Sequence, residues 1–221
     1  MIRAFSAALG LTLVLTACSS GPKPADWQLE AKAAMDRSVA AYLEGNSRVE
    51  AVELARARAE ISSTGRVDLM ARAELLHCAS HVASLVFEPC TGFEKLRPDA
   101  PPAETAYADY LAAKLLPQDA ALLPPQQRAA AQDTGDTAIR AMTEPLSQLV
   151  AAAVALRSDR ASPAIVQLAV DTASAQGWRR PLLAWLGVQL ALAEKPGGDA
   201  AQAARLRRRI ELTLGDAKVK R

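Results

Sequence analysis

The sequence predicts an all-α protein, built as an array or bundle of about seven or eight antiparallel helices. Half of the 221 residues are hydrophobic but only 4% are aromatic, so the apolar content is mainly alanine and leucine, which favour helices over strands. Apolar residues also recur every three or four positions, as on one face of a helix, and glycines and prolines interrupt this spacing at intervals.

The first two expected helices form a hairpin. The first begins at Trp27 and ends at Gly45-Asn46, a pair typical of helix C-termini. Ser47 is expected to cap the second helix, with Glu50 as its capping-box partner. The inward stripe expected for this helix consists of Val52, Leu54, Ala55, Ala59 and Ile61.

A third helix is expected from about residue 67 to about residue 85, with Asp68 in its first turn, where the helix dipole favours a negative charge. Residues 88–103 contain four prolines and a glycine, and they form either a connector between two helical halves or a functional loop. A helix over residues 104–116 follows this stretch.

Prolines divide the middle of the chain, and capping residues define its last third. A helical stretch begins after Pro125, and another covers residues 136–153, where Pro145 should kink or split it. Ser162 and Pro163 begin the next helix, as expected for a cap and a first helical position. The last two expected helices cover residues 178–194 and, capped by Asp199, residues 199–214.

The chain begins with the pattern of an export signal. Arg3 precedes an apolar run over residues 4–15, which is too short to span a bilayer as a permanent helix. The run ends in Leu-Thr-Ala-Cys, which resembles the lipobox of bacterial lipoproteins. The resemblance implies cleavage before Cys18 and acyl chains that anchor this residue in a membrane. Because Ser19 follows the cysteine, the resemblance also implies the periplasmic side of the outer membrane.

Two segments, residues 40–61 and 190–212, each read as a helix, a glycine turn and an Ala- and Leu-rich helix. They resemble tetratricopeptide hairpins, although the full 34-residue repeat pattern is not met. The expected organisation is a signal peptide over 1–17, a tether over 18–25, a single helical domain over 26–215 with halves 26–87 and 104–215 joined by loop 88–103, and a frayed basic tail over 216–221.

Two cysteines remain after Cys18 is lipidated, and an oxidising envelope favours a disulfide between Cys78 and Cys90. The bridge needs a sharp reversal, because a helix from residue 78 to 86 rises ~12 Å and four extended residues return only ~13 Å. The alternative is that His77 and His81, at positions i and i+4 on one helix face, bind a metal ion. A third alternative is that these residues are inert.

The charge balance and the motifs limit the function. With 26 basic and 24 acidic residues, the chain gives no electrostatic reason to bind nucleic acid. We find no catalytic motif, and therefore expect neither an enzyme nor a cofactor. The expected function is a helical protein-interaction or scaffold module that contacts another envelope protein. The alternative is a small-ligand or metal-binding lipoprotein; an envelope hydrolase is the third choice.

Overall fold

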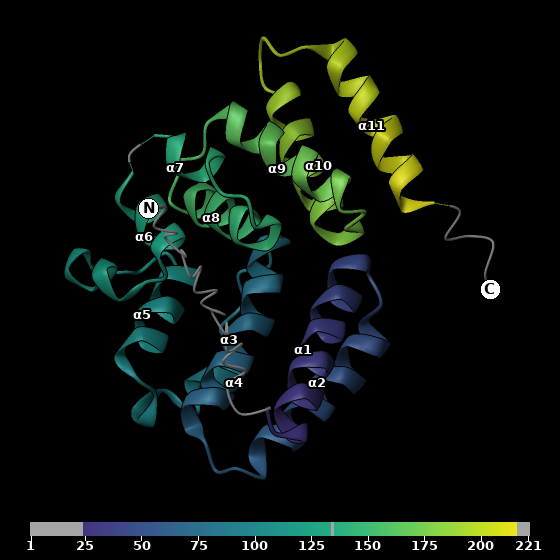
Figure 1. The fold of residues 1–221 in the computed structure, drawn as a ribbon. Coiled ribbons are helices and arrows are strands. Elements are labelled where there is room, and N and C mark those ends of the chain that lie inside the picture. The colour runs from purple at the N-terminus through teal and green to yellow at the C-terminus, as the bar shows by residue number, and fades with distance from the viewer. Residues whose placement is uncertain (1–23, 134, 216–221) are drawn as a thin grey trace, which may run out of the picture.

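A computed structural model describes residues 24–133 and 135–215, and helices are the only regular elements in those ranges (Figure 1). The all-α prediction is therefore confirmed for this part of the chain. The elements are α1 (Asp26–Glu44), α2 (Ser47–Ser62), α3 (Val67–Ala83), α4 (Thr91–Glu94), η1 (Arg97–Asp99), α5 (Pro102–Leu111), η2 (Pro117–Leu122), α6 (Pro125–Gln132), α7 (Thr137–Arg140), α8 (Pro145–Arg157), α9 (Pro163–Ala175), α10 (Arg179–Ala193) and α11 (Ala200–Leu214), where η marks a 3-10 helix.

Several sequence predictions concern residues outside these ranges. They are the signal peptide over 1–17, the lipidation of Cys18, most of the tether over 18–25 and the tail over 216–221. None of the helices in the described part of the chain is long and apolar enough to cross a membrane.

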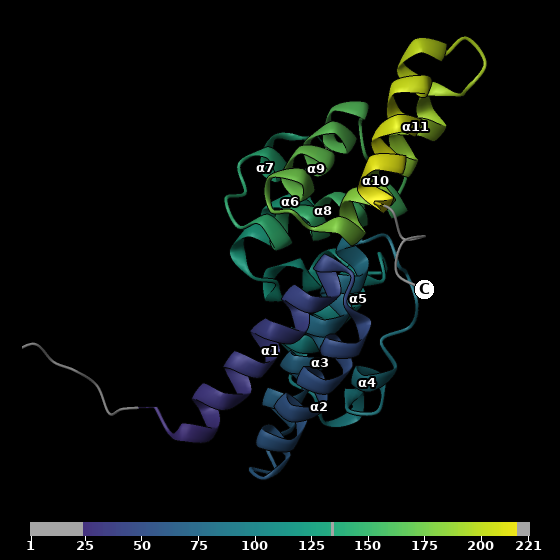
Figure 2. The same ribbon diagram turned by 90° about the vertical axis from the view of Figure 1, so that its right-hand side faces the viewer.

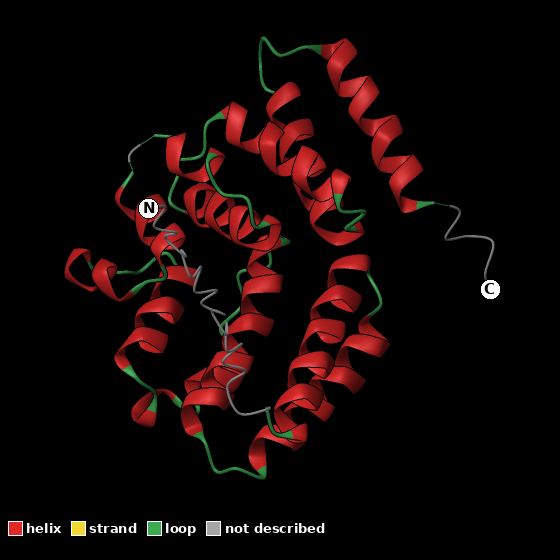
Figure 3. Cartoon of the chain, viewed as in Figure 1, coloured by secondary structure: helices red, strands yellow, loops and turns green. Residues whose placement is uncertain are grey.

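The described residues form eleven α-helices and two 3-10 helices, which is more than the seven or eight expected. One reason is Pro145, which takes the first position of α8 and so separates α7 from α8. The carboxylate of Glu144 accepts hydrogen bonds from the backbone N–H groups of Leu146 and Ser147, which caps the new helix. The other reasons are that the expected loop 88–103 contains α4 and η1 (Figure 3), and that η2 lies between α5 and α6.

Helix α3 lies in the middle of the molecule, between the α1–α2 hairpin and α5 (Figure 1). It also packs against α8, in which every residue from Gln148 to Ala155 is buried. A helix that is apolar on all sides is expected to lie inside the core. Trp185 on α10 is fully buried, and its indole N–H donates to the carbonyl oxygen of Ala83 at the end of α3.

Helices α9, α10 and α11 form the end of the molecule that lies away from the α2–α3 turn (Figures 1 and 2). Helices α9 and α11 begin at the predicted caps, since Ser162 accepts from the backbone N–H of Ile165 and Asp199 accepts from that of Gln202. The first residues of α10 reach back to the α1–α2 hairpin, where Arg180 donates to the hydroxyl of Ser47. This contact holds the guanidinium of Arg180 beside Glu50 of α2.

Candidate metal centre

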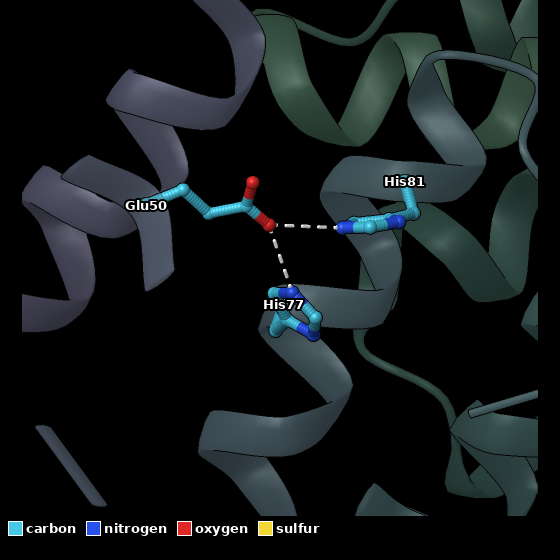
Figure 4. Close-up of side chains that lie close together, drawn as sticks. All are labelled: Glu50, His77 and His81. Atoms are coloured by element: carbon cyan, nitrogen blue, oxygen red, sulfur yellow. Dashed lines mark hydrogen bonds and ion pairs between the residues drawn. The ribbon is translucent and has the colours of Figure 1, made fainter. Parts of the chain in front are cut away.

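Three side chains from two helices meet beside the α1–α2 hairpin. Glu50 projects from α2, and His77 and His81, one turn apart on α3, both point toward it (Figure 4). The Nε2 atoms of His77 and His81 lie 3.0 and 3.1 Å from the same oxygen, Oε1 of Glu50. The cluster is largely enclosed, because the side chain of Glu50 is 11% exposed and those of the histidines are 25% and 27% exposed.

The spacing of these three donor atoms suits a small metal ion. The two nitrogens and the oxygen all lie within 4.8 Å of one another. In a tetrahedral zinc site with bonds of about 2.0–2.1 Å, neighbouring donor atoms are about 3.3 Å apart. The nitrogen–oxygen distances of 3.0 and 3.1 Å would therefore need only a small expansion to accept such an ion.

A cation and an aromatic ring support the site. Oε2 of Glu50 lies 3.6 Å from Nη1 of Arg180, and Nη2 of the same guanidinium donates to the hydroxyl of Ser47. The guanidinium carbon of Arg180 lies 4.2 Å from the ring centre of Tyr42, and the Tyr42 ring stacks on His81 with 3.9 Å between ring centres. These contacts restrict the rotation of the His81 ring and of the Glu50 carboxylate.

The protonation of His81 follows from its surroundings. Burial lowers the pKa of His81 below its ordinary value of 6.5, against the hydrogen bond to Glu50, which raises it. The imidazole is therefore neutral at neutral pH, which is the form that binds metal ions. Because a carboxylate only accepts hydrogen bonds, each ring donates its Nε2–H to Glu50, and a bound metal ion would replace those protons.

Cys78 and Cys90 lie at disulfide distance, as predicted, with their Cα atoms 5.8 Å apart. The reversal that this bridge needs is present, because α3 ends at Ala83, earlier than expected. Leu85 then adopts a left-handed conformation with φ of 61°, and the backbone N–H of Val86 donates to the carbonyl oxygen of His81. The disulfide thus holds the returning chain beside α3.

This returning chain closes a pocket of about 130 Å³ next to the two histidines. Glu88 and the disulfide line one part of it, and His77 and His81 line another. A water molecule takes up about 30 Å³ of liquid, so the pocket has room for water or a small ligand beside the imidazoles. The two imidazoles, but not Glu50, therefore border open space.

Three other side chains that could bind a metal ion line the same pocket as the histidines but do not join the cluster. Both oxygens of Glu74 accept hydrogen bonds from Arg58, at 2.5 and 2.6 Å. The sulfurs of Cys78 and Cys90 are occupied with each other. The third donor is instead Glu50, which the sequence led us to expect as a capping residue.

Glu50 was missed because the cap of α2 was placed one residue too late. The side chain of Asn46, and not that of Ser47, accepts from the backbone N–H of Val49. The predicted inward stripe was correct for Leu54 and Ile61, which are buried, but wrong for Val52, Ala55 and Ala59, which are exposed. A signal was nevertheless present, because a carboxylate occupies the first position of the stripe that is buried: Glu50, Leu54, Ala57 and Ile61.

Comparisons with known proteins add no further information about the site. No model of a known protein family matches the chain, and no curated protein or solved structure matches it either. The function must therefore be inferred from the residues and their geometry.

Proposed function

We propose that this protein binds a divalent transition-metal ion, zinc in particular, through Glu50, His77 and His81. The observation that carries the proposal is the convergence of one carboxylate and two imidazoles from separate helices on one point. We further propose that acylated Cys18 holds the helical body at the periplasmic face of the outer membrane. The Leu-Thr-Ala-Cys ending of the export signal supports that part of the proposal.

The donor set favours zinc over the hard cations. Imidazole nitrogens suit zinc, copper, nickel and iron, whereas calcium and magnesium prefer sites made of oxygen atoms only. Two histidines, a carboxylate and a free position also match the ligand number of zinc sites that keep one place for water. The pocket lined by His77 and His81 supports this choice, because it leaves room for water beside the imidazoles.

The experiment is a calorimetric titration of the metal-free protein with zinc, followed by cobalt substitution and absorption spectroscopy. The wild type should bind one zinc ion per chain, and the cobalt form should show the strong visible bands of a tetrahedral ion. Glu50→Gln and His81→Ala should each weaken binding by at least ~10-fold, because each removes one donor. Glu53→Gln is the matched control, because Glu53 lies on the same helix but pairs with Arg37.

Two results would overturn the metal proposal. One is zinc uptake well below one ion per chain by the wild type, and the other is equal affinity in Glu50→Gln and the wild type. In either case the protein-interaction module, with tetratricopeptide-like α1–α2 and α10–α11 hairpins, becomes the leading function. A helical domain that only binds another protein does not require a metal ion.

A further inference from the structure

A second cleft lies on another face of α3, between this helix, the start of α5 and the segment from η2 to α6. Its volume is about 410 Å³, within the usual range for small-molecule sites. Three polar side chains, Arg72, Glu104 and Tyr107, reach a wall that is otherwise apolar. The apolar part of the lining is made by Leu75, Leu76, Ala103, Leu122, Leu123 and Pro124.

Glu104 is the unusual residue in this cleft. Its side chain is 7% exposed, and Oε1 accepts a hydrogen bond of 2.6 Å from Nε of Arg72. Its other oxygen, Oε2, is buried and has no hydrogen-bond partner among the described residues. Glu74 is equally buried, yet both of its oxygens are bonded to Arg58. A buried carboxylate oxygen without a donor is costly, so Glu104 has an unused capacity to bind one.

The charge of Glu104 is only partly neutralised by its arginine. Arg72 makes one hydrogen bond to it, and the Arg72 side chain is 65% exposed, so water screens much of its charge. Burial raises the pKa of Tyr107, which keeps the phenol neutral. The cleft therefore combines an apolar wall with a carboxylate that can still accept from a cationic donor. Leu122, which is 42% exposed, would be covered by a bound apolar group.

We infer that this cleft binds a small amphiphile, with a primary ammonium group that donates to Glu104 and an aliphatic body that lies against Leu75, Leu122 and Leu123. Oε2 has almost no accessible surface in this structure, so the Glu104 carboxylate must turn toward the cleft for one of the three N–H donors of a primary ammonium to reach it, while Arg72 stays bonded to Oε1. The site does not depend on the metal centre, because it shares none of the three metal-binding residues.

The test uses three six-carbon probes that differ only in the head group: n-hexylammonium, n-hexanol and n-hexanoate. Each is titrated into the full mature protein, with methyl resonances of Leu75 and Leu123 followed by NMR. Hexylammonium should give saturable shifts at these methyl groups, and the other two probes should bind at least ~10-fold more weakly. Equal binding of hexanoate, or shifts that avoid both leucines, would overturn the proposal.

A pair of variants then isolates the carboxylate. Glu104→Gln should weaken hexylammonium binding at least ~10-fold, because the amide keeps the shape but loses the charge. Glu74→Gln is the control, since it removes an equally buried carboxylate of α3 that lies outside the cleft, and it should bind the probe as the wild type does. Unchanged binding in a folded Glu104→Gln variant would contradict the inference. If that variant does not fold, the comparison of the three probes on the wild type decides alone.

Discussion

Gly92 lies against an ion pair that leaves no room for a side chain. A Cβ atom at this position would be 1.9 Å from Oε2 of Glu74. The carboxylate cannot move away without cost, because Arg58 donates to both of its oxygens. The close approach of α4 to α3 therefore depends on a glycine at position 92.

Replacing Gly92 with alanine is expected to lower the free energy of unfolding by about 1–3 kcal/mol, because Glu74 must give up part of its pairing. Gly187→Ala is the matched control, since it lies inside α10 and its Cβ would meet nothing within 4 Å. The control should raise the stability by about 0.5–1 kcal/mol. Urea unfolding followed by circular dichroism measures both, and a Gly92→Ala protein as stable as the wild type would refute the argument.

At the same scale, Glu50 illustrates what the sequence leaves undetermined about the site. The i, i+4 spacing of His77 and His81 was sufficient to predict that both rings share a helix face. Their contact with Glu50 spans 27 and 31 residues of sequence, and only the packing of α2 on α3 creates it. The sequence also allowed Glu50 to be the capping-box partner of Ser47, but α2 is capped by Asn46 instead.

The sequence predicted where helices begin better than it predicted which helices pack against each other. Ser162, Pro163 and Asp199 begin helices where expected, because caps and proline restrict the backbone locally. Pro145 split its segment, for the same local reason. Which helices touch depends instead on the fit of their apolar faces, so the central place of α3 was not visible in the sequence.

The Cys78–Cys90 disulfide joins α3 to the chain that returns along it, and its removal measures how much this link stabilises the fold. A Cys78→Ser/Cys90→Ser variant should lose ~3 kcal/mol of unfolding free energy, as expected for a loop closed over 12 residues. Its zinc affinity should stay unchanged, because the three donors lie on α2 and α3 and not on the returning chain. Denaturant unfolding with and without reducing agent measures the first effect, and zinc titration measures the second. If neither the variant nor the reducing agent shifts the unfolding midpoint, the disulfide does not stabilise the protein.

The whole molecule has two apolar clusters in its described part, and α3 contributes to both. Ala73 belongs to the cluster shared with α1 and α2, whereas Leu75 and Val82 belong to the larger cluster that includes α8, α9 and α10. The proposed metal centre lies where these two parts meet, since Glu50 comes from α2 and Arg180 from α10. A bound ion would stabilise the packing of α2 on α3, the helix that the two parts share.

The proposed anchor also concerns the molecule as a whole. Cys18→Ser should move the protein from the membrane fraction to the periplasmic fraction, because serine cannot form the thioether that carries the lipid. Ser20→Ala is the control and should remain with the outer membrane. Fractionation and mass spectrometry of the N-terminal peptide give the answer, and a Cys18→Ser protein that still sediments with membranes would contradict the lipoprotein proposal.

The hydrogen bond between Trp185 and Ala83 bears on the order in which the chain folds. It joins positions that are 102 residues apart, so it cannot form until α10 has packed against the end of α3. The Cys78–Cys90 bridge, with a separation of 12, requires only a short loop to close. The turn that ends α3 can therefore be fixed covalently before α10 packs against it, and the carbonyl of Ala83 gains its indole partner only when Trp185 arrives.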